Sequence, residues 1–233
     1  MKVPYSNLAC TAYSTRTLYD MKDVLYEIEQ SESQQNKDLY FMYRQAHASE
    51  NDLMRMKSEN IRYDITIIPP GKNGSEYAKT YGHYHPLSPS NIPYPEIYQV
   101  LKGKATYILQ KYDLSKFIVI KAEAKDIVTI PPGYGHVTIN ESDEELVAAN
   151  WVSDLFSSDY ELIKKKRGFL YYLTDIGFVK NNSYEKHPEI TYEKPNVPKN
   201  GNIQSGKDMY DLINTPDELS FLNSPEKANY FFE

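Results

Sequence analysis

TYGHYHPLSPSNIPYPEIYQVLKG, residues 80–103, contains two histidines one residue apart, a ten-residue spacer and Glu96 at the start of an apolar run that ends at Gly103. Residues i and i+2 of a β-strand point to the same face, so His83 and His85 can place both imidazoles on one side of a sheet. A His-x-His pair alone is common on exposed strands, and a single glutamate there is usually a strand-end charge. The pair gains meaning only if Glu96 and the distant His136 join the same site.

The composition of the chain excludes several classes of protein. With 26 basic and 32 acidic residues among 233, the net charge of −6 is a poor match to a nucleic-acid surface. Cys10 is the only cysteine, so no internal disulfide can form. No signal-peptide core follows Met1-Lys2, and no run approaches the ~20 apolar residues of a membrane span. We therefore expect a soluble cytoplasmic protein with no nucleic-acid or membrane partner. The 22 tyrosines suit both a β core and a pocket for a polar ligand.

Short β-branched and aromatic runs, separated by Gly, Pro and Asp turns, predict an all-β fold. Eight such runs are residues 39–43, 61–68, 97–101, 105–109, 117–120, 127–130, 137–139 and 146–152. Many short strands at close intervals favour an antiparallel sandwich or jelly roll. The turn centred on Gly103 is expected to close a hairpin.

The length suits one main domain with extensions. We expect an N-terminal arm over 1–36, a barrel domain over 37–175 and a polar C-terminal extension over 176–233. Within the arm, Leu18, Met21 and Leu25 have roughly helical spacing, and Thr17 or Asp20 can cap a short helix there.

His136 follows the turn Pro131-Pro132-Gly133-Tyr134-Gly135, far from the other candidate ligands in sequence. Three imidazoles and one carboxylate suit a divalent ion such as Fe, Mn, Ni, Zn or Co and leave positions open for substrate oxygens. The remaining histidines, His47 and His187, lie among polar residues and are expected on the surface.

These residues resemble the two sequence motifs of the cupin superfamily. The first motif matches at His83, His85, Glu96 and Gly103, and the second at Pro131, Gly133, His136 and Asn140. Two features depart from the pattern: the ten-residue spacer is longer than usual, and Lys125 stands where a glycine often precedes the second motif. The resemblance implies a cupin jelly-roll β-barrel, an antiparallel double sheet with short peripheral helices.

More of the chain, from about Arg16 to Phe169, is similar to the cupin-type glucose-6-phosphate isomerases of archaea and some bacteria. The elements Thr-x-Gly-His-x-His at 80–85 and Glu-x-Tyr-x-x-Leu-x-Gly at 96–103 carry most of this similarity. The implied metal ligands are His83, His85, Glu96 and His136. The implied substrate contacts are Thr66, Thr80, Gly82, Tyr98 and Tyr160, with Trp151 at the position of a pocket tyrosine and Tyr40 or Tyr43 as a further match.

The resemblance implies a metal-dependent aldose–ketose isomerase that interconverts glucose 6-phosphate and fructose 6-phosphate in glycolysis and gluconeogenesis. Fe²⁺ is the first expected ion, with Mn²⁺, Ni²⁺, Zn²⁺ or Co²⁺ as alternatives, and a homodimer is expected. Glu96 is the only acid among the four ligands, so it is the candidate base; direct hydride transfer is the competing mechanism. The same ligands also fit a mononuclear-iron cupin dioxygenase or a non-catalytic sugar-binding cupin.

Overall fold

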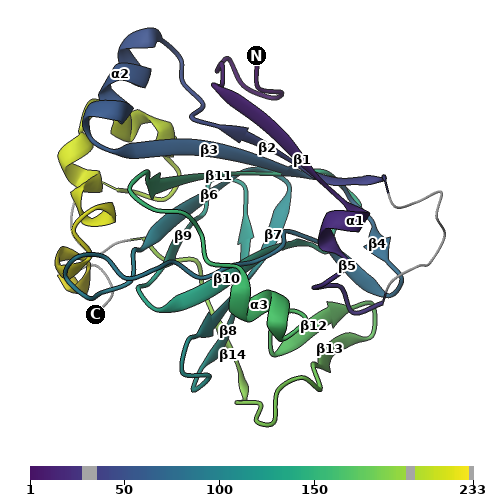
Figure 1. Ribbon diagram of the computed structural model, residues 1–233. Helices are drawn as coiled ribbons and strands as arrows, with labels where there is room; N and C mark the ends of the chain where they lie inside the picture. The colour runs from purple at the N-terminus through teal and green to yellow at the C-terminus, as the bar shows by residue number, and fades with distance from the viewer. Residues whose placement is uncertain (28–35, 198–202, 231–233) are drawn as a thin grey trace.

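Two curved sheets face each other and enclose the main core of the protein (Figure 1). The computed structural model describes residues 1–27, 36–197 and 203–230, so parts of the expected N-terminal arm and C-terminal extension lie outside it. The first sheet has the order β1 (Ala12–Thr17), β2 (Asp38–Arg44), β3 (Ile61–Ile68), β11 (Leu146–Ser153), β6 (Glu96–Lys102) and β9 (Ile127–Ile130). The second has the order β13 (Gly177–Lys180), β12 (Tyr171–Thr174), β5 (Glu76–Lys79), β10 (Tyr134–Asn140), β7 (Lys104–Lys111), β8 (Phe117–Glu123) and β14 (Ile190–Glu193), with β4 (Lys72–Asn73) paired to β5.

Between β5 and β12 the chain crosses repeatedly from one sheet to the other, as β6 to β7 and β9 to β10 to β11 show. Within the part of the chain that the structure describes, the strand pairs are antiparallel except the pair of β14 with β8. This is the double-sheet jelly roll of the cupins, so the predicted fold class is confirmed. Each of the eight predicted strands is present.

The prediction of a hairpin at Gly103 is wrong, because β6 and β7 belong to different sheets. Gly103 has φ +81°, and a Cβ added to it would lie 2.7 Å from the carbonyl oxygen of Glu145. The residue therefore makes the sharp turn by which the chain crosses from one sheet to the other. A glycine between two apolar runs predicts a turn, but the partners of each strand depend on distant segments.

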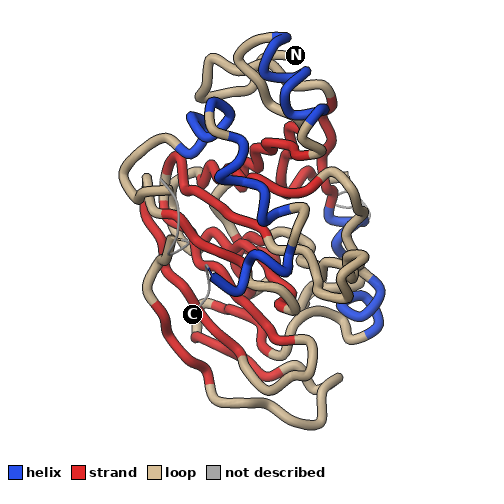
Figure 2. Tube along the Cα trace, turned by 90° about the vertical axis from the view of Figure 1, so that its left-hand side faces the viewer, coloured by secondary structure: helices blue, strands red, loops and turns tan. Residues whose placement is uncertain are grey.

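Short helices lie at the edges of the barrel, as predicted (Figure 2). Helix α1 (Leu18–Met21) begins at Thr17, whose side chain and that of Asp20 form a reciprocal capping box. The others are α2 (Glu50–Ser58), α3 (Glu161–Lys165) and the 3₁₀ helices η2 (Met209–Asn214), η3 (Pro216–Leu222) and η4 (Pro225–Tyr230). No helix in the described ranges has the length and apolar character needed to cross a lipid bilayer.

A second apolar core covers the outer face of the first sheet. The C-terminal 3₁₀ helices lie there beside α2 (Figure 1). Gln99 fixes this segment, because its amide accepts from the N–H of Met209 at 2.8 Å and donates to the carbonyl of Lys207 at 2.7 Å. The central strands of the first sheet, such as β11, are thus buried on both faces, and only the inner face of the sheet lines the barrel.

Candidate metal and substrate site

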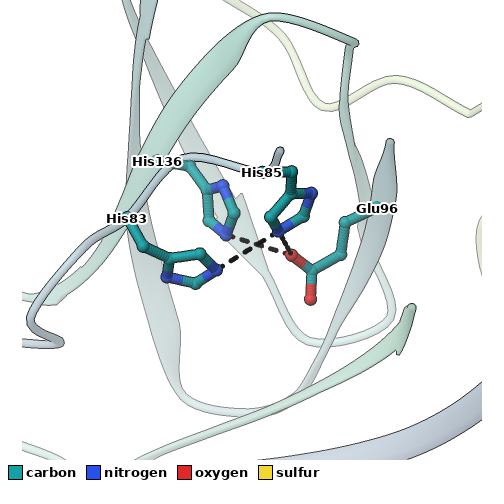
Figure 3. Close-up of side chains that lie close together, drawn as sticks. All are labelled: His83, His85, Glu96 and His136. Atoms are coloured by element: carbon teal, nitrogen blue, oxygen red, sulfur yellow. Dashed lines mark hydrogen bonds and ion pairs between the residues drawn. The ribbon is translucent and has the colours of Figure 1, made fainter. Parts of the chain in front are cut away.

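Four side chains from three segments of the chain meet in the barrel interior (Figure 3). Glu96 begins β6 of the first sheet, whereas His136 lies in β10 of the second. His83 pairs with His136 through two backbone hydrogen bonds, from His83 N at 3.2 Å and from His136 N at 3.0 Å. His85 follows two residues later, so the predicted strand alternation turns both imidazoles toward Glu96.

The ligand atoms of these four residues all lie within 4.8 Å of one another. The Nε2 atom of His85 is 3.2 Å from both Nε2 of His83 and Oε2 of Glu96. The Nε2 atom of His136 is 3.1 Å from the same carboxylate oxygen. Metal–ligand distances of about 2.0–2.2 Å bring ligand atoms to similar separations.

The hydrogen bonds around the cluster favour a cation at its centre. Nδ1 of His85 is 2.8 Å from the carbonyl oxygen of Tyr94, which only accepts, so Nδ1 carries the proton and Nε2 presents a lone pair. That lone pair faces Oε2 of Glu96, a buried atom without a hydrogen-bond partner among the described residues. Two acceptors in contact repel each other, and a bound metal ion removes the conflict.

The charge states also suit metal binding. Burial and the neighbouring imidazoles lower the pKa of His83 well below its usual value. Burial likewise lowers the pKa of His136, against the opposing effect of Glu96. Burial alone raises the pKa of Glu96, but the neighbouring imidazoles of His136 and His85 outweigh burial and hold that pKa well below its usual value. Neutral imidazoles and an ionised carboxylate are the forms that bind divalent metals.

The long spacer supports this arrangement. It folds back on itself, with hydrogen bonds from Ser88 N to Ile92 O at 2.9 Å and from Tyr94 N to Pro86 O at 3.3 Å. The fold-back presents the Tyr94 carbonyl to His85. Such contacts to the outer nitrogen of a ligating histidine fix its tautomer and orientation.

A pocket opens at the four ligand residues, which form part of its lining. Five of the six predicted substrate contacts line it: Thr66, Thr80, Gly82, Tyr98 and Tyr160. Of the two candidate matches for a further tyrosine, Tyr40 lines the pocket and Tyr43 packs in the outer core. Gly82 has φ +77°, and an added Cβ would overlap the ring of Phe169, so this position is restricted to glycine.

The predicted pocket position of Trp151 is wrong. Its side chain is fully buried in the outer core, stacked near Tyr63 and Tyr210, and its indole N–H donates to the carbonyl of Met209 at 2.8 Å. Its neighbours Asn150 and Val152 point inward and line the pocket instead. Adjacent residues of a strand face opposite sides, so a shift of one residue moves a side chain to the other face.

Replacing Trp151 tests this placement. Trp151→Phe is expected to lower the free energy of unfolding by about 1–3 kcal/mol, because it removes a buried hydrogen bond and aromatic volume. Urea denaturation measures this loss, and substrate turnover should stay close to that of the unmodified protein. Tyr98→Phe is the matched control inside the pocket and should impair turnover more than stability. A Trp151 variant with normal stability and poor substrate affinity would contradict this placement and show that Trp151 contacts the substrate.

Several pocket residues were not predicted. Arg44, Arg62 and Asn150 line the cavity from the first sheet, and Ser158 lines it from the loop before α3. The two-residue period of strands β2 and β3 could have predicted the two arginines, because Arg44 shares a face with Tyr40, and Arg62 shares a face with Thr66.

The prediction that His47 is exposed is also wrong, since the residue is 7% exposed and its Nδ1 lies 2.8 Å from the carbonyl of Gln45.

Comparison with known proteins gives one family match and several relatives. The family model described as glucose-6-phosphate isomerase matches residues 15–189. Glucose-6-phosphate isomerase of Thermococcus litoralis is 31% identical over 66% of this chain and 76% of its own length. The enzymes of that name from Pyrococcus abyssi and Sinorhizobium medicae are 32% and 29% identical, over 57% and 58% of this chain and 65% and 63% of their own lengths.

Solved structures with similar backbones are more distant. An oxalate oxidase has a TM-score of 0.42 and 14% identity, covering 61% of this chain and 64% of its own. A Bacillus subtilis oxalate decarboxylase has a TM-score of 0.38 and 22% identity, covering 57% of this chain and 29% of its own.

Proposed function

Because this chain belongs to the glucose-6-phosphate isomerase family, we propose that it interconverts glucose 6-phosphate and fructose 6-phosphate with a divalent metal ion. The observation that carries the proposal is the cluster of four ligand atoms within 4.8 Å, set in a pocket lined by five predicted substrate contacts. His83, His85, Glu96 and His136 would hold the ion. Three neutral nitrogens and one carboxylate suit Fe²⁺, which we propose as the resident ion, with Mn²⁺, Ni²⁺, Zn²⁺ and Co²⁺ as alternatives.

The bound ion would supply Lewis-acid stabilisation of the negative charge that develops on O1 and O2 of the sugar during isomerisation. The protein itself must move a proton between C1 and C2. Glu96 is suited to this role because Oε2 faces the imidazoles, whereas the second carboxylate oxygen points away from them (Figure 3). One oxygen can therefore act as ligand while the other accepts the proton from carbon.

Tyr98 is placed to assist this proton transfer. Its hydroxyl lies 3.1 Å from Nε2 of His136, and burial together with Glu96 raises the pKa of Tyr98 well above its usual value. The phenol therefore stays protonated at neutral pH and can donate a hydrogen bond to a sugar oxygen. Thr66, Thr80, Gly82 and Tyr160 would contact the rest of the sugar phosphate. The Thr80 hydroxyl accepts from Thr138 N at 3.1 Å, and its own proton remains available for the ligand.

The decisive test is a coupled isomerase assay on metal-reconstituted protein, with mannose 6-phosphate assayed in parallel. Formation of glucose 6-phosphate from fructose 6-phosphate is the expected result. Oxygen consumption without isomerisation would identify a dioxygenase instead. Sugar-phosphate binding without turnover or oxygen uptake would identify a binding protein. Three expectations stay predictions: the cytoplasmic location, the role in glycolysis and gluconeogenesis, and the homodimer. Light scattering tests the dimer directly.

A further inference from the structure

Arg44, Asp64 and Arg62 form a charged group, here called the arginine cluster, on the inner face of the first sheet. Asp64 is fully buried and accepts from Arg44 Nη1 at 2.7 Å, from Arg62 Nε at 2.8 Å and from the backbone N–H of Gln45 at 3.0 Å. Arg62 also contacts the more exposed Asp154 at 3.1 Å. Asp64 thereby holds both guanidinium groups at the pocket wall, which Arg44 and Arg62 line.

The arginine cluster lies directly beside a predicted substrate contact. Asp64 and Thr66 share one face of β3, about 6.6 Å apart along the strand. Met42 pairs with Thr66 across β2 and β3, and Nη2 of Arg44 turns back to within 3.1 Å of the Met42 sulfur. The guanidinium group of Arg44 therefore lies beside Met42, the strand partner of Thr66, while its side chain stays 35% exposed.

The cluster keeps guanidinium N–H donors that its own ion pairs do not use. Both arginines contact the buried Asp64, and Arg62 also pairs with the more exposed Asp154, so the positive and negative charges of the group balance. Burial lowers the pKa of Arg62 and of Arg44, but the neighbouring Asp64 outweighs burial and raises the pKa of both residues. The other N–H groups of these two guanidiniums have no further hydrogen-bond partner in the ranges that the structure describes.

A sugar phosphate needs cationic hydrogen-bond donors. The predicted contacts Thr66, Thr80, Gly82 and Tyr160 carry no full charge at neutral pH, and a phosphate dianion that leaves water without a cation is strongly disfavoured. Guanidinium groups match phosphate oxygens through paired N–H donors. We propose that Arg44 and Arg62 bind the phosphate group of the substrate next to Thr66, an inference that rests on the proposed function.

Binding and turnover should separate this role from a structural one. Arg44→Gln and Arg62→Gln are each expected to weaken the affinity for fructose 6-phosphate about 10- to 100-fold, the range for a lost hydrogen bond to a charged group. Inorganic phosphate should inhibit the unmodified protein and lose most of its effect on both variants. Turnover of free fructose at high concentration should not change, since it has no phosphate. Lys116→Gln, which removes an exposed charge from the β7–β8 turn, is the matched control and should behave like the unmodified protein.

Calorimetry keeps this inference separate from the proposed function. If the protein binds fructose 6-phosphate through the two arginines but does not isomerise it, the proposed function fails and the phosphate site stands. If the glutamine variants isomerise with unchanged affinity for fructose 6-phosphate and for inorganic phosphate, the phosphate site is refuted and the proposed function stands. Equal losses for the phosphorylated and the free sugar would also refute it. Should a glutamine variant not fold, Arg44→Lys and Arg62→Lys keep the charge beside Asp64, and the same selective loss for phosphorylated ligands is expected from the missing paired donors.

Discussion

Glu96→Gln is expected to lower kcat for fructose 6-phosphate by about 100- to 10,000-fold, the contribution of a positioned general base. The amide has the same shape as the carboxylate but cannot accept a proton from carbon. Binding of the sugar phosphate should fall much less than turnover, because the substrate contacts of the pocket lie elsewhere. Single-turnover kinetics and calorimetry measure the two effects separately.

Glu96 is also a proposed metal ligand, so the metal content of the variant must be measured alongside its activity. Full metal occupancy with lost turnover supports the role of base; lost occupancy supports only the role of ligand. Glu123→Gln, an exposed change in β8, is the matched control and should leave activity unchanged. Isomerisation in D₂O adds a further distinction, because proton transfer through Glu96 incorporates solvent deuterium at C1 or C2 and a hydride shift does not. Normal kcat in Glu96→Gln would exclude Glu96 as the base.

Removing the metal with a chelator is expected to abolish isomerase activity, and Fe²⁺ or Mn²⁺ should restore it. The loss should be accompanied by lower stability, because a ligand that binds only the native state adds free energy of unfolding, about 4 kcal/mol at 1,000 times its dissociation constant. Without the ion, the lone pair of His85 Nε2 faces the buried oxygen of Glu96 at 3.2 Å. Thermal denaturation with and without metal measures the stability change.

His136→Ala provides a second measurement of the same site. It removes one proposed ligand and should weaken metal binding without filling the pocket, so activity should return only at higher metal concentration. Undiminished turnover in protein shown by elemental analysis to be free of metal would overturn the metal-dependent mechanism. If metal stabilises the protein but does not increase isomerisation, the metal site is supported and its catalytic role is refuted.

The main features of the fold could be predicted from the sequence because their signals are local, and four residues of the site could be predicted because they match the cupin motifs. The alternation of His83 and His85, the two Pro-Gly turns and the short apolar runs each depend on near neighbours in the chain. The helix α2 was missed, as were the strands β1, β4, β5, β12, β13 and β14. β1 is an edge strand whose residues 12–14 are exposed, so it lacks the alternation of a half-buried strand. The C-terminal 3₁₀ helices were missed because short helices of this kind are stabilised by packing on the sheet rather than by their own sequence.

The sequence by itself determined the jelly-roll pattern and, through its resemblance to the cupin motifs, the four residues that converge on one site; a period of two fixed only that His83 and His85 share a face. It did not determine which face is the interior. Every residue of β11 is buried, so Trp151 and Asn150 have equally buried environments and only the packed sheets show that Asn150 lines the pocket. The tertiary structure likewise decided the sheet change at Gly103 and brought Arg44 of β2 to Asp64 of β3, because strand pairing is a long-range contact.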